Sequence, residues 1–458
     1  MVFGSVVFLF RFLPVFLVLY FITYLWPSAG RMRNVILFLG SLLFYAWGEP
    51  TGVLLLLCST VLHYIYGRLI GHFRESVFAG GLLVLSIVMD LTILLGFKFG
   101  VGDLLLPIGI SFYTFRAMSY TIDVYRGKVK AQRMLLDFGI YVTMFPTIIA
   151  GPIVRYREVQ EQLKDRPFQP EGISYGFRRF CVGLAKKALL ADQLALLWQE
   201  ISRQGELSVL SAWLGIVAFA LRIYFDFSGY SDMAIGLGAI LGFKLPENFR
   251  YPYLSASVTE FWRRWHVTLG RWFRDYVYIP LGGNRKGILR QLVNLLIVWV
   301  LIGILHGVGW NFLLWGLWIA LFLILEKVIP DRMMKNLPGV IGWLYTTLVV
   351  LIGWVFFALE DMSSLGQYLS ALFGIGADGL YNAFGLYCLR ENAVLLILAV
   401  AAATPVGSRM AAGLQKNGSS LGMIIRRFCE KLVLAVLLLL SIAYIVNSPG
   451  VLFPYFRF

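Results

Sequence analysis

The chain has 458 residues, of which 59% are hydrophobic and only 14% are charged. A soluble globular domain usually carries about 25% charged residues. Apolar runs long enough to cross a bilayer recur from one end of this chain to the other. The composition therefore excludes a soluble enzyme, a disordered chain and a small secreted disulfide scaffold. It predicts an all-α, multi-pass membrane protein with a single transmembrane domain over residues 1–458.

Twelve apolar stretches are predicted to be membrane segments. In chain order they cover residues 4–26, 34–48, 51–67, 77–99, 104–124, 173–199, 207–226, 289–309, 311–329, 339–358, 392–408 and 432–448. The first stretch is too long and too uniformly apolar for a cleaved signal peptide, and it lacks a small-residue cleavage site. We expect it to be retained as the first span.

The net charge of +15, from 40 Lys and Arg against 25 Asp and Glu, does not point to nucleic acid. The cations lie in clusters between apolar stretches, the largest at residues 155–187 and 250–290, and no nucleic-acid-binding motif accompanies them. Cytoplasmic loops of membrane proteins are enriched in Lys and Arg. The basic clusters are therefore predicted to lie on the cytoplasmic side, where they contact anionic lipids of the bilayer. The acidic residues Glu360, Asp361 and Asp378 are predicted to lie on the outer side.

Two apolar stretches contain residues that interrupt a simple span. Residues 136–154 contain Pro146 and a Gly-Pro pair at 151–152, and residues 227–243 contain four glycines and Asp232. Irregular backbone at membrane depth persists only where it is buried in protein or lines a wet cavity. We expect both stretches to be re-entrant segments around a central funnel.

Residues 258–280 have the pattern of an amphipathic helix. The apolar stripe at helical spacing consists of Trp262, Trp265, Leu269, Trp272 and Tyr276. The pattern predicts an interfacial helix with indoles at headgroup depth. Its arginines could contact phosphates of lipid or of an acyl donor: Arg263, Arg264, Arg271 and Arg274. His266 falls toward the apolar side, an unusual place for an anchoring residue.

The four histidines differ in their surroundings. His63 and His72 are interpreted as helix-end or headgroup contacts, because nothing polar is arranged around them in the sequence. His306 lies in an otherwise apolar stretch, where an ionisable group is costly and is a functional candidate by default. A neutral imidazole that only bonds a neighbouring helix is the structural alternative.

Acyl transfer from a thioester needs few protein groups. It needs a base for the acceptor hydroxyl, donors for the developing oxyanion and a channel that joins the two substrates. His266 and His306 could supply such groups, with His306 as the base or acyl-relay residue and His266 supporting it. The candidate channel-lining residues are Asn311, Asn294, Asp226, Asp232, Trp310 and Trp265. Asp226 or Asp232 could instead pair with Arg222 or a histidine, or hold helices together.

No metal or bound cofactor is expected. The four cysteines lack the spacing of a zinc site or a disulfide framework, and no P-loop, HExxH or Rossmann glycine pattern is present.

Seven sequence motifs in order carry a resemblance to a known family. They are GPIVRY (151–156), GLAKKALLAD (183–192), YFDFSGYSDMAIGLG (224–238), PENFRYPY (246–253), TEFWRRWH (259–266), WFRDYVYIPLGGN (272–284) and HGVGWNFLLWGL (306–317). Together they resemble the membrane-bound O-acyltransferase (MBOAT) family, in particular its bacterial branch for alginate and peptidoglycan O-acetylation. The motif-bearing core covers residues 136–330 or so.

The resemblance implies a ring of helices around a funnel, thinned by re-entrant segments. It matches His306 to the near-invariant family histidine, His266 to the second one, and Asp192 to the aspartate of the KKxxxAD motif. It implies a cytoplasmic acyl thioester donor, either acetyl-CoA or an acyl carrier protein thioester. The acyl group would pass to a cell-surface polysaccharide, directly or through an extracytoplasmic SGNH-type partner protein.

Two positions depart from the family pattern. Leu305 replaces the tryptophan that usually precedes the histidine, and Ile319 stands where a further histidine is often found.

These observations favour an O-acetyltransferase of the bacterial inner membrane. Two alternatives stay within the family, a D-alanyl transferase and a lipid acyltransferase. One from another class is a transporter of small anions or lipids, whose expected sign of inverted repeats is not visible in the sequence.

Overall fold

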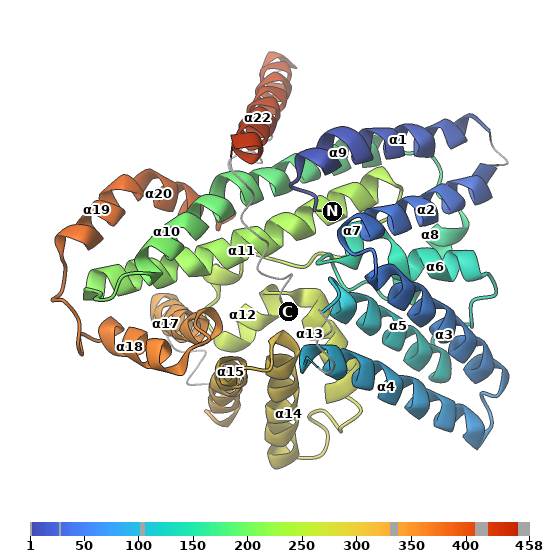
Figure 1. Ribbon diagram of the computed structural model, residues 1–458, viewed down its shortest axis with the longest axis horizontal. Coiled ribbons are helices and arrows are strands. Elements are labelled where there is room, and N and C mark those ends of the chain that lie inside the picture. The colour runs from blue at the N-terminus through green and yellow to red at the C-terminus, as the bar shows by residue number, and fades with distance from the viewer. Residues whose placement is uncertain (1, 27–28, 101–105, 330–337, 408–419, 448–458) are drawn as a thin grey trace. The chain divides into compact units, whose positions relative to one another are not determined.

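A computed structural model describes residues 2–26, 29–100, 106–329, 338–407 and 420–447 (Figure 1). All regular secondary structure in these ranges is helical, which confirms the predicted all-α class. Residues 104–105, 408 and 448 of the predicted spans lie outside the described ranges. The chain forms two compact units. The first comprises Met1–Leu184, Tyr230–Glu247 and Ile445–Phe458, and the second comprises Ala185–Gly229 and Asn248–Tyr444.

The first unit contains the N-terminal helices. They are η1 (Phe8–Phe12), α1 (Leu13–Ile22), η2 (Thr23–Leu25), α2 (Gly30–Gly48), α3 (Gly52–His72), α4 (Val77–Lys98), α5 (Ile110–Tyr125), α6 (Leu135–Thr143), α7 (Phe145–Ile148), α8 (Tyr156–Lys164) and α9 (Pro170–Ala185). Helices α3, α4 and α5 pack side by side, as Figure 1 shows.

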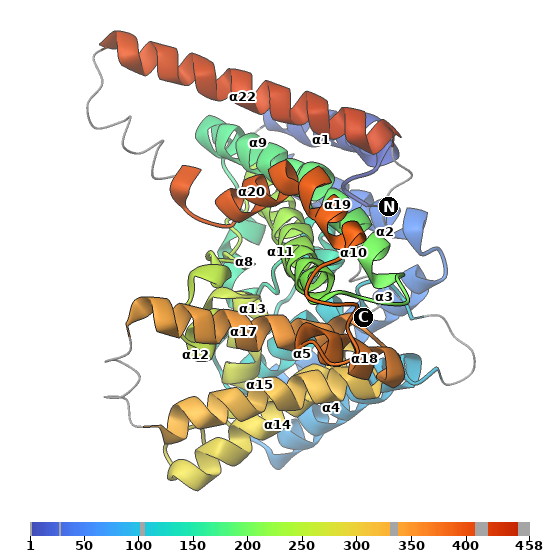
Figure 2. The same ribbon diagram turned by 90° about the vertical axis from the view of Figure 1, so that its left-hand side faces the viewer.

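The second unit carries most of the motif-bearing helices. They are η5 (Lys186–Ala191), α10 (Asp192–Ser202), η6 (Pro252–Leu254), α12 (Val258–Arg264), α13 (Val267–Phe273), η7 (Arg274–Tyr278), α14 (Ile288–His306), α15 (Trp310–Val328), α17 (Gly339–Ala358), α18 (Met362–Leu372), α19 (Ala383–Glu391) and α20 (Ala393–Ala402). Helices α14, α15 and α17 lie side by side (Figure 2). Two long helices contribute residues to both units: α11 (Val209–Ile240) and α22 (Ser420–Asn447).

Eight helices among the described residues are long and apolar enough to cross a membrane. They cover Phe8–Leu25, Gly52–His72, Val77–Lys98, Val209–Ile240, Ile288–His306, Trp310–Val328, Gly339–Ala358 and Phe428–Asn447. The pair α19 and α20, bent by 57°, passes the same test together as a ninth. The expected count of about twelve is not reached by this measure. Helix α5 has only 16 residues, and helices α9 and α10 are 16 and 11 residues long.

Residues 136–154 have the broken backbone that the sequence predicts. Helix α6 ends at Thr143, the short α7 follows, and the chain then runs non-helically to Arg155. Protein groups bond part of its polar backbone and side chains: the Arg116 guanidinium donates to the Tyr141 carbonyl (3.2 Å) and to the Thr147 hydroxyl (2.6 Å). The Ser41 hydroxyl accepts the Phe145 N–H at 3.1 Å. The whole break is buried, as irregular backbone in a membrane protein must be.

The prediction that residues 227–243 form a second re-entrant segment is wrong. Helix α11 runs without a break through it to Ile240. Gly236 instead allows a close helix crossing, since a Cβ there would lie 2.6 Å from the Gly176 carbonyl oxygen on α9. The glycines fit a packing requirement between helices, which the sequence pattern does not distinguish from a helix break.

The predicted amphipathic helix over residues 258–280 is also corrected. The segment divides into α12, α13 and the π-helix η7, with the break between α12 and α13 at Trp265 and His266. Trp265 and Trp272 are buried at 3% and 4% exposure. The stripe therefore packs largely inside the protein, whereas an interfacial helix would turn it toward lipid.

Candidate active site

His306 is the last residue of α14, and it is held by a tight helical hairpin. A Cβ on Gly316 of α15 would lie 2.5 Å from the Trp299 carbonyl oxygen, and one on Gly303 of α14 would lie 2.7 Å from that of Phe312. Only glycine allows the two backbones to approach so closely. The hairpin places the Trp315 ring 5.1 Å from the imidazole of His306.

The hydrogen bond of His306 defines its tautomer. Nδ1 lies 2.7 Å from the Ile302 carbonyl oxygen, which can only accept, so Nδ1 carries the proton. In the neutral imidazole the lone pair is then on Nε2. The side chain is buried, with an exposed fraction of 9%. In its neutral form, an imidazole held in this way presents the Nε2 lone pair, which is suited to act as a general base.

His266 lies in the short break between α12 and α13. Its φ of 42° places it in the left-handed region, a conformation shared among the described non-glycine residues only with Tyr251. Asn248 holds it there, because the Asn248 Oδ1 lies 3.0 Å from His266 Nδ1 and also accepts from Thr268 Oγ1 at 2.9 Å. The ring packs edge-on against Phe227, with centroids 4.6 Å apart.

The start of α12 is fixed by a carboxylate that is distant in sequence. Glu326, near the end of α15, accepts from the backbone N–H groups of Val258 (2.6 Å) and Thr259 (2.8 Å). A negative charge at a helix N-terminus is favourable because the N–H groups there lack helical partners. This contact was not predicted from the sequence, since nothing local links residues 258 and 326.

A cluster of aromatic rings connects the two histidines. The Trp354 ring of α17 lies 5.0 Å from Trp265, which precedes His266, and 6.1 Å from Trp315, which contacts His306. The two imidazoles are within electrostatic reach. Burial and, second to it, His306 hold the pKa of His266 well below its ordinary value. The structure thus brings together the two histidines that the sequence singles out.

Asp192 lies in a different constellation of the same unit. Lys187 of η5 bridges two carboxylates, with Nζ 2.7 Å from Asp192 Oδ1 and 2.9 Å from Asp226 Oδ1. Its cationic side chain is largely buried, so the two acids offset the cost of placing it in the apolar interior. The sequence suggested Arg222 or a histidine as the ion-pair partner of Asp226. In the structure Asp226 pairs with Lys187. The role of Asp192 in catalysis stays a prediction.

The other predicted lining residues have separate surroundings. Asn311 donates to the Phe356 carbonyl at 3.2 Å, and Asn294 donates to the Gly283 carbonyl at 3.0 Å. Trp310 is 72% exposed. Asp232 belongs to the first unit, where it accepts from Arg179 at 2.7 Å.

Two of the four predicted phosphate-binding arginines have acidic neighbours. Arg264 pairs with Glu260 at 2.5 Å and Arg274 with Asp275 at 2.8 Å. Arg263 is exposed and Arg271 half-buried. Their predicted contact with phosphates remains untested. Within the described residues, no three His, Cys, Asp or Glu side chains are grouped as a metal site.

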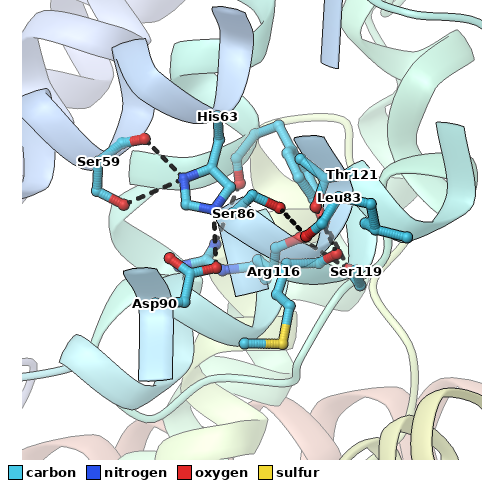
Figure 3. A network of polar contacts seen from close by, with 10 residues as sticks. Ser59, His63, Leu83, Ser86, Asp90, Arg116, Ser119 and Thr121 are labelled. Atoms are coloured by element: carbon cyan, nitrogen blue, oxygen red, sulfur yellow. Dashed lines mark hydrogen bonds and ion pairs between the residues drawn. The ribbon is translucent and has the colours of Figure 1, made fainter. Parts of the chain in front are cut away.

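The first unit contains a buried ionisable pair that sequence reasoning missed. His63 of α3 lies with Nε2 2.9 Å from Asp90 Oδ2 of α4 and Nδ1 2.8 Å from the Ser59 carbonyl, as Figure 3 shows. The interpretation of His63 as a helix-end contact is wrong, since its side chain is 0% exposed. Because Nδ1 must donate to the carbonyl, one further proton lies between Nε2 and Asp90. The signal that could have revealed this pair is Asp90, an acidic residue within an apolar span.

Comparison with known proteins identifies a family. The model of the membrane-bound O-acyltransferase family, MBOAT, matches residues 132–360. The chain is 42% identical over 397 residues to the "Probable alginate O-acetylase AlgI" of Pseudomonas syringae pv. tomato, which covers 82% of this chain and 76% of that protein. It is 32% identical over 427 residues to the "Peptidoglycan O-acetyltransferase" of Helicobacter pylori, with 83% and 81% coverage.

A more distant relative extends the range of acyl groups. The "Teichoic acid D-alanyltransferase" of Bacillus subtilis is 28% identical over 227 residues, which cover 47% of this chain and 58% of that protein. The family model, the extensive similarity to the two acetylating enzymes and the apolar helices agree with one another. The chain therefore belongs to the membrane-bound O-acyltransferase family and is a multi-pass O-acyltransferase of a bacterial membrane.

Proposed function

We propose that this protein transfers an acetyl group from a cytoplasmic thioester, acetyl-CoA or an acetylated carrier protein, toward a hydroxyl of a cell-surface polysaccharide. The extensive similarity to a probable alginate O-acetylase and to a peptidoglycan O-acetyltransferase supports an acetyl group and a polysaccharide acceptor. The basic residues around η7 support a donor that carries phosphates. The acceptor is reached directly or through an extracytoplasmic SGNH-type partner.

The observation that carries this proposal is the geometry of His306. With Nδ1 bonded to the Ile302 carbonyl, the Nε2 lone pair removes the proton of the acceptor hydroxyl. The oxygen then attacks the thioester carbonyl carbon, a C–O bond forms, and the C–S bond breaks. The thiolate takes up the proton from the imidazolium, so the imidazole returns to its neutral form. A thioester suits this site because its thiolate leaves readily once the nucleophile is activated.

His266 and Asp192 have supporting roles in this scheme. Burial and, second to it, His306 lower the pKa of His266 well below its ordinary value, and a neutral imidazole suits a residue that supports His306. Asp192 fixes Lys187 within η5, together with Asp226.

The first test replaces His306 with Ala or Gln. We expect the O-acetyl content of the surface polysaccharide to fall to that of the deletion strain. In purified protein, we expect CoA release from acetyl-CoA to fall by about 10²-fold or more, because the general base is lost. His72→Ala is the matched control, since His72 is an exposed residue at the end of α3.

A His306→Ala variant that remains in the membrane and keeps a wild-type O-acetyl content would overturn the assignment of the base. Wild-type protein that prefers a D-alanyl or long-chain acyl donor over acetyl would overturn the assignment of the acyl group. Binding of acyl-CoA without any release of CoA in the presence of acceptor would instead indicate transport.

A further inference from the structure

Trp354 occupies a central position in the aromatic cluster of the second unit. Its side chain is 1% exposed, and its ring lies between the neighbours of both histidines. The Trp354 ring centroid lies 5.0 Å from that of Trp265, the residue before His266. It lies 6.1 Å from Trp315 and 5.5 Å from Phe357, and both of these rings contact the His306 ring. Trp354 is therefore one ring that links the surroundings of the two histidines, and Trp262, 6.5 Å from Trp265 and 5.7 Å from Trp315, is another.

The indole N–H of Trp354 is buried without a hydrogen-bond partner among the described residues, and the same is true of Trp262. The two rings are 6.3 Å apart between centroids. An indole nitrogen can only donate, and a buried one normally finds an acceptor. Both rings contact Trp315, which contacts the residue proposed as the base, and two such donors in one cluster indicate an acceptor supplied by a ligand.

Other tryptophans of the second unit show the usual arrangement. Trp318 donates to the Val349 carbonyl at 2.9 Å, Trp213 to that of Leu372 at 2.9 Å, and Trp343 to that of Tyr253 at 2.8 Å. In these three tryptophans the indole N–H is paired with a backbone carbonyl. Trp354 and Trp262 differ from them, because their indole N–H groups are buried without a partner among the described residues.

We propose that the indole N–H groups of Trp354 and Trp262 donate to the carbonyl oxygen of the acyl thioester and to the oxyanion that forms from it. This inference rests on the proposed acyl transfer and adds the donors that such a reaction needs. Among the parts of the donor, the thioester carbonyl fits an apolar, ring-lined site because it is a neutral acceptor. During attack by the hydroxyl, negative charge develops on that oxygen, where fixed donors in a dry site are most effective.

The test compares two ligands that differ only in this oxygen. Acetyl-CoA carries the carbonyl, whereas S-ethyl-CoA has a CH2 group in its place and cannot react. We expect the wild-type protein, without acceptor, to bind acetyl-CoA about tenfold more tightly, the discrimination that one or two buried hydrogen bonds provide. Trp354→Phe and Trp262→Phe each remove one N–H and keep an aromatic ring. Each should reduce this preference and lower kcat/KM for acetyl transfer by about 10²- to 10³-fold.

Trp318→Phe is the matched control, because it removes an indole N–H that already has a protein acceptor. It should keep the wild-type preference and a near-wild-type kcat/KM. Binding of S-ethyl-CoA reports whether each variant is folded, and if Trp354→Phe fails to fold, Trp262→Phe carries the test alone. A wild-type preference for acetyl-CoA in a folded, donor-deficient variant would overturn this inference. A wild-type protein that releases no thiol from acetyl-CoA or from an acetylated carrier protein would overturn the proposed function instead.

Discussion

At the scale of single residues, His266 combines a strained backbone with a buried neutral side chain. Its left-handed φ of 42° costs free energy that Asn248 offsets through its bonds to the imidazole and to Thr268. Burial and the neighbouring His306 lower the pKa of the imidazole well below 6.5. Folding therefore requires His266 to be uncharged, which links stability to pH.

The linkage has a defined sign. Because the pKa of His266 is lower in the folded state than in the unfolded state, the unfolded chain binds the extra proton first as the pH falls. We expect the midpoint temperature of thermal unfolding of the detergent-solubilised protein to be constant above pH 6.5 and to fall progressively as the pH drops below 6.5. His266→Asn keeps a residue that tolerates the left-handed conformation and removes this titration, so its midpoint should fall less over the same range.

The measurement is a thermal unfolding series from pH 7.5 downward, with His72→Ala as a control that removes an exposed imidazole. Identical pH dependence in the wild type and His266→Asn would show that other groups control the acid response.

At the scale of elements, the α14–α15 hairpin determines where His306 lies. The crossing depends on Gly316 and Gly303, whose missing side chains leave room for the carbonyls of Trp299 and Phe312. The partners of these glycines lie on the adjacent helix, so the sequence does not show them. The same reason explains the error at residues 227–243, where Gly236 serves a crossing with α9.

Gly316→Ala tests this requirement. The new Cβ would meet a backbone oxygen at 2.5 Å, so α15 must shift away from α14 and carry Trp315 with it. We expect a loss of stability of about 1–3 kcal/mol and a clear drop in acyl transfer. Gly81→Ala on α4 is the control, since a Cβ there meets nothing within 4 Å and alanine favours the helix. Unchanged midpoint and activity in Gly316→Ala would contradict the close crossing.

At the scale of the whole molecule, charge and apolar surface decide how the chain is inserted. The helix windows that could span the membrane range from 6% buried in α22 to 72% buried in α11, so some helices face lipid and others face protein. The large basic clusters favour one side of the membrane and the acidic loop at Glu360 the other.

Cysteine labelling tests this topology. In a background without the four native cysteines, Glu360→Cys should react with a membrane-impermeant maleimide in intact spheroplasts, and Arg274→Cys should react only after permeabilisation. Both positions are exposed, so accessibility within the protein does not separate them. Labelling of Arg274→Cys in intact spheroplasts would place the basic segment outside and reverse the proposed orientation.

The sequence alone determined the membrane class, the helical character and the family, and it selected two histidines whose roles stay a prediction. These follow from composition, helical periodicity and motifs, which are properties of neighbouring residues. The broken backbone at residues 136–154 was predictable for the same reason, since proline and glycine act locally.

Only the tertiary structure decided which groups meet. Asp90 is 27 residues from His63, Glu326 is 68 residues from Val258, and Trp354 lies on a different helix from both histidines. An apolar span looks the same in sequence whether its polar residue binds a neighbouring helix, a substrate or water. The partner is fixed by how the helices cross, because burying an ionisable or donor group is tolerable only where packing supplies its counterpart.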